Sequence, residues 1–380
     1  MSRQLATVQR VKVLEEIPGK DKIVLASFEG VGFKVIVSKE ETKVGDLVVY
    51  FEADTLLPDK PEFEFLRARC WTPKWNGHRV RCMKMGGVFS EGLSLSLKDL
   101  NIVYAAEGED FTDRLGVRKY DPEAMEESAL LEKARQHGKV YNFFYRFAFF
   151  RKIIGFYYWL TKKKKQKYSF PDFIAKTDET RVQNLNVFVD DKWKDLQVYI
   201  SEKINGQSCT CFIRKGKFGV CSRNLMLKED DSKYWQIVKT YNIEEILRNA
   251  VNELKVDLAI QMENCGPGIQ GNNYGFTELR SFIFNVYDID HKVYCGLAAL
   301  QEFSKKSGLS LVPILETRKF DWAGTSELTK YADGYSVFGD NKVLREGIVI
   351  RPLIPLPPER GMSNIWSLKV ISPSFILKHQ

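Results

Sequence analysis

The residue best suited to covalent chemistry is Lys203, in the segment SEKINGQS that runs from Ser201 to Ser208. The residues before Lys203 alternate between apolar and polar, which predicts a strand that ends there. Asn205-Gly206 is typical of a tight turn into a following strand. The lysine amine would then lie at a strand end, close to backbone N–H groups. Because lysines at strand ends are often only surface charges, Lys203 by itself does not indicate catalysis.

Five further polar motifs follow Lys203. They are SRN (222–224), MENCGPGIQGN (262–272), FNVYDID (284–290), EGIVIRP (346–352) and SLKVIS (367–372). With the KxxG of Lys203 and Gly206, this order resembles the signature of the covalent nucleotidyltransferases. EKxxG, ExxGPGIQ and FxxYDI resemble the RNA ligase 2 superfamily rather than DNA ligases or capping guanylyltransferases. The first 100 residues and the segment FPDFIAKTDETRVQNL are similar to the Deinococcus- and Naegleria-type branch, RNA ligase 5.

The resemblance implies a role for each matching residue. Lys203 would attack the α-phosphate of ATP, form a lysyl-adenylate and release pyrophosphate. Arg223 would hold the ribose and the terminal RNA phosphate, and Glu263 would bind the ribose. Tyr287 would stack on adenine, with its hydroxyl group needing a partner. Glu346 would bind Mg²⁺ or Mn²⁺, and both ions suit carboxylate ligands.

The same resemblance implies that Arg351 and Lys369 neutralise phosphates. The phage-type pattern has two lysines spaced KxK near the end, but here the first position is Ser367. Lys369 would therefore contact the α-phosphate alone. The remaining motif positions are assigned to ATP, namely Glu202, Asn205, Gly206 and Ser208, or to the metal ion, namely Asp288 beside Glu346.

The chemistry requires Lys203 to lose its proton. A free lysine has a pKa of about 10.4, so deprotonation at pH 7 costs about 4.6 kcal/mol. We expect Lys369, Arg351 and a metal ion on Glu346 to crowd positive charge against Lys203 and to lower its pKa.

The elements around these motifs predict an α+β protein with antiparallel sheets. Four short strands before residue 54, separated by turn signals, favour a small OB-like β-barrel at the N-terminus. Strands dominate again after Trp193, with a helix near Lys239 to Leu254. We expect an OB-like nucleic-acid-binding module at 1–105, a linker and insert at 106–170, and a nucleotidyltransferase domain at 171–380.

A strip of aromatic and basic residues closes the N-terminal module: Trp71, Trp75, Arg79, Arg81 and Lys84. Interleaved rings and cations suit base stacking and phosphate neutralisation, so they are candidate RNA contacts. A half-buried strand with a solvated face would look the same.

The net charge of +8 comes from one segment. Residues 133–171 hold eleven Lys or Arg and no acid, and the rest of the chain has 46 bases and 49 acids. A membrane span there would bury Arg146, Arg151 and Lys152 at a cost of about 7–10 kcal/mol, so we expect none. A docked helical hairpin, a strip that touches nucleic acid and an interfacial membrane helix remain open.

Seven cysteines without zinc-finger spacing are expected to be buried thiols in a reducing compartment, either cytoplasm or nucleus, of a cellular or viral protein. The leading functional hypothesis is a monomeric, ATP-dependent RNA ligase that seals 3′-OH and 5′-phosphate ends, with nicked duplex RNA as the expected partner. The alternatives are DNA or mixed-strand ligation, RNA capping, and a catalytically degenerate nucleic-acid-binding subunit.

Overall fold

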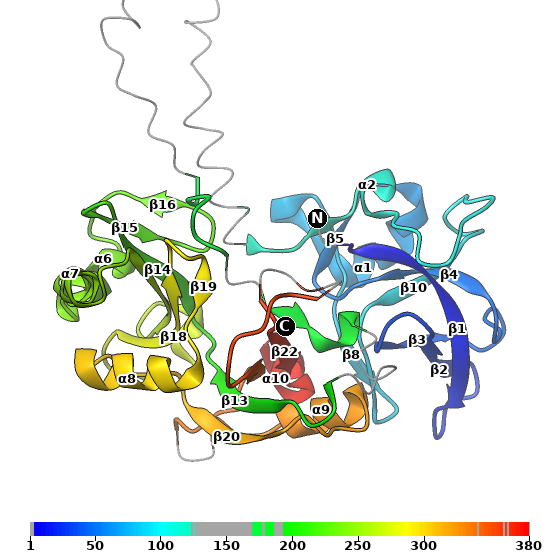
Figure 1. Cartoon of the computed structure of the whole chain (residues 1–380). Helices are drawn as coiled ribbons and strands as arrows, with labels where there is room; N and C mark the ends of the chain where they lie inside the picture. The colour runs from blue at the N-terminus through cyan, green and yellow to red at the C-terminus, as the bar shows by residue number, and fades with distance from the viewer. Residues whose placement is uncertain are drawn as a thin grey trace, which may run out of the picture.

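The computed structural model describes residues 4–122, 125, 169–176, 179–185, 193–339, 342–359, 362 and 365–379. In Figure 1 the N-terminal domain lies on the right and the C-terminal half of the chain on the left and in the centre. The basic-aromatic insert, including Arg146, Arg151 and Lys152, lies outside the described residues. None of the helices in the described part of the chain is long and apolar enough to cross a membrane.

Two sheets and one hairpin build the N-terminal domain. The first sheet has the order β10-β4-β1-β2-β3, with β1 at Ala6–Glu16, β2 at Ile23–Phe28, β3 at Lys34–Ser38, β4 at Leu47–Phe51 and β10 at Leu93–Ser96. The second has the order β11-β5-β7-β6, with β5 at Thr55–Pro58, β6 at Trp71–Thr72, β7 at Gly77–Arg79 and β11 at Arg118–Lys119. The hairpin pairs β8 (Met83–Met85) with β9 (Val88–Ser90).

The long strand β1 contributes to two cores because successive side chains of a strand point to opposite faces of the sheet. Val8 packs with Phe51 and Phe111 in one core, and Val11 packs with a second cluster around Phe33. Short helical segments connect the strands: η1 (Pro61–Leu66), α1 (Arg67–Cys70), η2 (Pro73–Trp75) and α2 (Thr112–Leu115).

The expected end of the N-terminal domain at residue 105 is too early. β11 pairs with β5, and Phe111 and Val117 are buried in the N-terminal core. The backbone N–H of Val8 donates to the carbonyl of Glu109 at 2.9 Å. Residues 106–120 therefore complete this domain, because the chain returns along β1 before it leaves.

The C-terminal half contains two more sheets. The five-stranded sheet has the order β12-β22-β21-β13-β20, with β12 at Thr180–Arg181, β13 at Gln197–Lys203, β20 at Ile314–Lys319, β21 at Gly347–Pro352 and β22 at Leu368–Ile371. The six-stranded sheet has the order β16-β15-β14-β17-β18-β19, with β14 at Gln207–Arg214, β15 at Lys217–Cys221, β16 at Met226–Leu227, β17 at Leu258–Cys265, β18 at Arg280–Asp288 and β19 at Val293–Tyr294.

Helices cover each sheet on one side. Helices α6 (Lys233–Thr240), α7 (Ile243–Leu254) and α8 (Leu297–Ser307) bury apolar residues against the six-stranded sheet. Helix α9 (Thr325–Ala332) packs on the five-stranded sheet, and α10 (Pro373–His379) ends the described chain. The 3₁₀ segments are η3 (Val182–Asn184) and η5 (Gln270–Asn272). The expected α+β architecture is confirmed, with one parallel pair, β12 and β22.

The seven cysteines are all free thiols. Cys82, Cys209, Cys211, Cys221 and Cys265 are buried as expected, but Cys70 and Cys295 are only partly buried. These two lie at the edges of elements, Cys70 at the end of α1 and Cys295 beside the end of β19.

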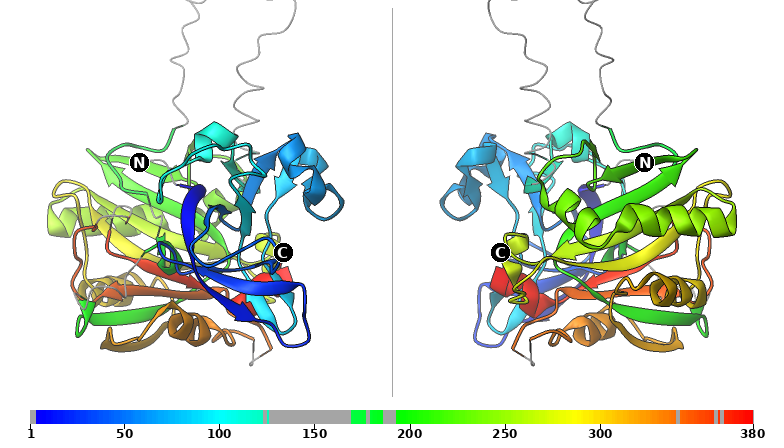
Figure 2. Two further views of the ribbon diagram at one scale, coloured as in Figure 1. Left: turned by 90° about the vertical axis from the view of Figure 1, so that its right-hand side faces the viewer. Right: turned by 90° about the vertical axis from the view of Figure 1, so that its left-hand side faces the viewer.

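A buried ion pair joins the two halves of the chain, whose strands and helices Figure 2 shows from two further sides. Arg181 of the C-terminal half contacts Glu91 of the N-terminal domain, and their side chains are only 10% and 9% exposed. Burial raises the pKa of Glu91 while Arg181 lowers it. The Gly32 backbone N–H also donates to the Gln183 carbonyl at 2.8 Å.

Replacing one partner of this buried pair should destabilise the protein strongly. We expect Arg181→Met to lower the free energy of unfolding by about 3–5 kcal/mol, because Glu91 would stay buried without its cation. Urea denaturation measures the loss. The matched control is Arg10→Met, whose partner Glu107 is 36% exposed, and it should cost less than about 1 kcal/mol. Equal losses in the two variants would contradict the structural role of Arg181.

Candidate active site

A cavity of about 470 Å³ lies where the two C-terminal sheets meet. Its polar lining comes from both sheets and from the segment before β12. It includes Glu179, Glu202, Lys203, Asn205, Gly206, Ser208, Arg223, Glu263, Glu346, Arg351 and Lys369. Eleven positions between residues 179 and 369 thus converge on one cavity, and ten of them are predicted site residues.

The strand registers explain how Lys203, Glu346 and Lys369 meet. Lys203 pairs with Gly347 across β13 and β21, which places Glu346 beside the lysine. Lys369 on β22 pairs with Val349 of the same central strand. A side chain at Gly347 would overlap the Val370 carbonyl, so only glycine allows this close strand approach.

The expected turn between Lys203 and the next strand is present, and it carries the chain from one sheet to the other. β13 belongs to the five-stranded sheet and β14 to the six-stranded sheet. A Cβ atom at Gly206 would overlap the Asn264 carbonyl oxygen and lie 2.9 Å from Glu263 Cγ. Gly206 therefore lets the chain pass close to β17. The Asn205 backbone N–H donates to the Tyr274 hydroxyl group at 2.7 Å and fixes the crossing.

Lys203 forms an ion pair with Glu346, with Nζ 2.6 Å from Oε1. The two side chains are 22% and 17% exposed. Burial alone would lower the pKa of Lys203, but Glu346, Glu263 and Glu179 outweigh burial and raise it. The pKa of Lys203 is therefore raised in the metal-free protein by the surrounding carboxylates, whereas the expected lowering concerns the site with a metal ion on Glu346.

Glu263 lies in the same acidic group. Burial raises the pKa of Glu263 to about 8, although Lys203 opposes the change. Around neutral pH this carboxyl group therefore takes up a proton readily.

Hydrogen bonds hold the Arg351 side chain in place. It donates to Glu179 Oε1 at 2.9 Å, to the Phe284 carbonyl at 2.8 Å and to Asn285 Oδ1 at 2.9 Å. A further bond runs from Nε to Ser367 Oγ at 2.9 Å. Ser367, where the phage-type pattern has a lysine, is fully buried and supports this arginine. Arg351 therefore organises the wall of the cavity.

The aromatic ring at the cavity is Phe284, and the assignment of Tyr287 is wrong. The register of β17 with β18 skips Phe284, which lines the cavity with Arg351 5.6 Å from its ring. Tyr287 is 5% exposed and packs with Ile174, Phe212 and Tyr294. The segment before β12 covers it, so its ring cannot reach the cavity.

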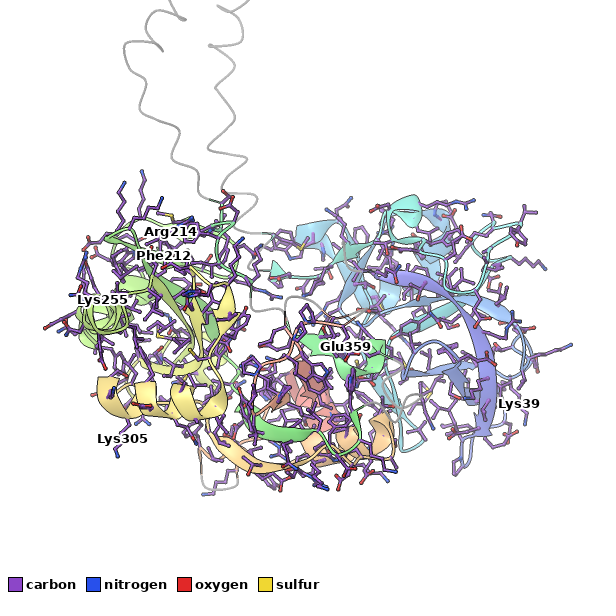
Figure 3. All side chains as sticks on the ribbon, viewed as in Figure 1. Lys39, Phe212, Arg214, Lys255, Lys305 and Glu359 are labelled. Atoms are coloured by element: carbon purple, nitrogen blue, oxygen red, sulfur yellow. The ribbon has the colours of Figure 1, made fainter. Side chains whose placement is uncertain are left out.

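The segment before β12 also packs against β14, whose Phe212 and Arg214 are labelled at the upper left of Figure 3. Phe173 packs edge-on against Phe212 at 5.3 Å, and Arg214 lies 3.8 Å above the Phe173 ring.

Asp288 lies outside the cavity, so its assignment to the metal ion is wrong. It ends β18 and accepts hydrogen bonds from the backbone N–H and the ring of His291, at 2.9 and 2.8 Å. Burial acts to raise the pKa of Asp288, but the hydrogen bonds from His291 outweigh burial and lower it. This carboxylate stabilises the turn between β18 and β19.

Glu202 lines the cavity, but its carboxylate faces another segment. It accepts hydrogen bonds from the Ser336 hydroxyl group at 2.6 Å and from the Val337 backbone N–H at 2.9 Å. Its side chain therefore anchors the loop after α9 beside Lys203.

Sequence reasoning missed three cavity residues that carry an acidic group or an aromatic ring: Asp121, Glu179 and Phe284. Asp121 pairs with Arg223 at 3.3 Å, across more than 100 residues of chain. Glu179 lies in a segment without a regular motif. The one available signal was the FxxY pattern itself, which offers two aromatic rings and does not say which one faces the ligand.

A second cavity of about 330 Å³ continues from the first toward the N-terminal domain. It shares Lys203, Arg223, Glu346 and Lys369, and Arg79 and Lys119 line its other wall. Arg79 donates to Asp54 Oδ1 at 2.7 Å and lies 4.3 Å above the Tyr120 ring.

The other four predicted RNA contacts do not line this cavity. Trp71 packs between Arg67 and His78. The Arg67 Cζ atom lies 4.1 Å from the Trp71 ring centre, and the ring centres of Trp71 and His78 are 4.9 Å apart. Lys74 lies 5.0 Å from the Trp75 ring. Arg81 and Lys84 are exposed on the same domain.

Comparisons with known proteins agree with this arrangement. Residues 196–371 match the family model described as RNA ligase, and residues 5–97 match a model described as an OB-fold domain. No curated protein matches the chain.

Among solved structures, the Naegleria gruberi RNA ligase with PPi is 26% identical, with a TM-score of 0.77 over 100% of this chain and 99% of that chain. A mutant of that ligase with ATP and Mn is 25% identical, with a TM-score of 0.77 and 99% of both chains covered. The expected likeness to the Naegleria-type ligases and the expected OB fold are confirmed. The chain therefore contains an RNA ligase domain at residues 196–371, which follows an OB-fold domain at residues 5–97, and its fold is similar to that of the Naegleria gruberi RNA ligase.

Proposed function

We propose that this chain is an ATP-dependent RNA ligase that joins 3′-OH and 5′-phosphate ends through a lysyl-AMP on Lys203. The observation that carries the proposal is the partly buried Lys203 amine, 2.6 Å from Glu346, in a cavity that Arg223 and Lys369 also line. Similar ligases with ATP, AMP and PPi support the choice of nucleotide.

The cavity has suitable groups for each part of ATP. Phe284 offers a ring for stacking on adenine. Glu263 and Arg223 offer hydrogen bonds to the ribose, and Lys369 offers a positive charge to the phosphates. The N–H groups of Arg351 already donate hydrogen bonds to protein groups. We therefore assign Arg351 to positioning Phe284 and Glu179 rather than to binding phosphates.

The carboxylate oxygens around Lys203 are suitable ligands for Mg²⁺ or Mn²⁺. Glu346, Glu263 and Glu179 bring carboxylate oxygens to one amine, and such oxygens are the preferred ligands of these ions. A bound ion would stabilise negative charge on the phosphates. The Lys203 ammonium group pairs with the same oxygens that would hold the ion, so Glu346 is the residue that both cations share.

Release from Glu346 would make Lys203 a nucleophile. A cation held by Glu346 would weaken the ion pair that raises the lysine pKa, and burial would then favour the neutral amine. Lys203 therefore exchanges a carboxylate partner for a phosphate electrophile.

The reaction then proceeds in three transfers. The Lys203 lone pair attacks the α-phosphorus, a P–N bond forms, the nitrogen loses a proton, and the bond to the β-phosphate oxygen breaks as pyrophosphate leaves. The RNA 5′-phosphate then attacks the lysyl-AMP phosphorus, the Lys203 nitrogen takes up a proton, and the P–N bond breaks to restore the amine. The 3′-OH finally attacks the activated 5′-phosphate, loses its proton, and AMP leaves.

We assign the RNA ends to the second cavity. It joins the Lys203 site to the OB-fold domain, and Arg79 and Lys119 supply positive charge there. A nicked duplex is the proposed substrate and a monomer the proposed active form. The seven free thiols support the expected reducing compartment.

Lys203→Arg should abolish labelling of the protein by ATP with a labelled α-phosphate. The neutral fraction of arginine at pH 7 is about a hundredfold to a few thousandfold below that of lysine. The matched control is Lys239→Arg, a surface residue that is 59% exposed, which should label normally. Labelling of Lys203→Arg above one per cent of the wild-type rate would overturn the assignment.

Phe284→Ala should weaken ATP binding by about tenfold or more, because base–aromatic stacking contributes about 1–3 kcal/mol. The KM for ATP in the adenylylation step measures this effect. Tyr287→Leu, which removes the other ring of the motif, is the control and should leave the KM unchanged. A larger effect of Tyr287→Leu than of Phe284→Ala would restore the original assignment of the stacking ring.

A further inference from the structure

A second group of metal-ligating side chains lies in the OB-fold domain. Ligand atoms of Asp59, Glu64 and His78 all lie within 4.8 Å of one another. Asp59 follows β5, Glu64 belongs to η1, and His78 is the middle residue of β7. None of the three lines the cavities that contain Lys203.

His78 is the unusual member of this group. Its side chain is fully buried, and neither ring nitrogen has a hydrogen-bond partner among the described residues. The strand position enforces the burial, because β7 is paired with β5 on one side and with β6 on the other. Leaving a buried polar group unpaired costs about 1–3 kcal/mol. A ligand on the imidazole would remove this cost.

The imidazole can serve as a ligand without a further partner, because a neutral imidazole offers one nitrogen lone pair.

A cation already sits between the two carboxylates. Arg67 Nε donates to Glu64 Oε1 at 2.6 Å, and another of its nitrogens contacts Asp59. The Arg67 side chain is 38% exposed and lies over the Trp71 ring, so its head can turn toward solvent without unfolding a core. The two acids thus form a pocket for positive charge beside a free imidazole.

We propose that Asp59, Glu64 and His78 form a binding site for Zn²⁺, with Arg67 as a built-in competitor. One imidazole and two carboxylates leave a fourth position for water, which matches tetrahedral zinc. The imidazole disfavours Mg²⁺ and Ca²⁺, which prefer oxygen ligands. Asp59 and Glu64 are 41% and 55% exposed, so their side chains can close on an ion.

A bound ion would tie η1 to the second sheet of the domain. It would also fix the surface around Trp71, since β6 carries Trp71 and pairs with β7 at His78. The inference is independent of the ligase chemistry, because it needs no residue of the Lys203 cavity.

The test is Zn²⁺ binding to the full-length, metal-free protein in millimolar Mg²⁺, which occupies the oxygen-rich Lys203 site. Equilibrium dialysis gives the stoichiometry and Kd, and Co²⁺ in place of Zn²⁺ gives an absorption spectrum diagnostic of tetrahedral ligation. We expect the double variant Asp59→Asn/Glu64→Gln to bind one Zn²⁺ fewer than wild type. The matched control Glu15→Gln/Glu16→Gln, on exposed acids of β1, should bind as wild type.

Arg67→Ala separates a metal site from a merely structural cluster. Removing the competing positive charge should tighten Zn²⁺ binding by about tenfold, whereas loss of structure would weaken it. Melting curves without zinc confirm that each variant is folded. Equal Zn²⁺ stoichiometry in wild type and the double variant, or binding by Arg67→Ala that is unchanged or weaker, would overturn the proposal.

Discussion

The site depends on the ion pair between Lys203 and Glu346. At 2.6 Å, in a cavity with two further carboxylates, this contact keeps the amine charged and in place. Protonation protects the nucleophile from unwanted reactions and makes its activation conditional. A metal ion on Glu346 would compete with the lysine for this carboxylate, which would couple metal binding to activation of the nucleophile.

The two C-terminal sheets position the Lys203–Glu346 ion pair at the proposed nucleotide site. β13, β21 and β22 bring Lys203, Glu346 and Lys369 together through their registers. The crossing at Gly206 then carries the chain to the second sheet, which supplies Glu263 and the Phe284 ring. Arg351 links the two sheets through bonds to Ser367 and to the Phe284 carbonyl. A change at Arg351 would therefore alter nucleotide binding without touching the reacting atoms.

Much of this could be predicted from the sequence, since strand alternation and motif order located nearly every cavity residue between Glu202 and Lys369. The failures have physical causes. Tyr287 and Asp288 follow the right motif, but the skipped register at Phe284 and a covering segment decide which side chains face the cavity. The lysine pKa depends on Glu179, which carries no motif. The return of residues 106–120 to the N-terminal core depends on long-range pairing that local patterns do not encode.

The most direct measurement is the pH dependence of Lys203 acetylation by acetic anhydride, read by peptide mass spectrometry with and without saturating Mn²⁺. The account predicts that metal-free Lys203 titrates above the ordinary lysine pKa of about 10.4, and that Mn²⁺ lowers this pKa. A metal-free pKa below the ordinary value, or a titration that Mn²⁺ leaves unmoved, would contradict control of the nucleophile by the carboxylate.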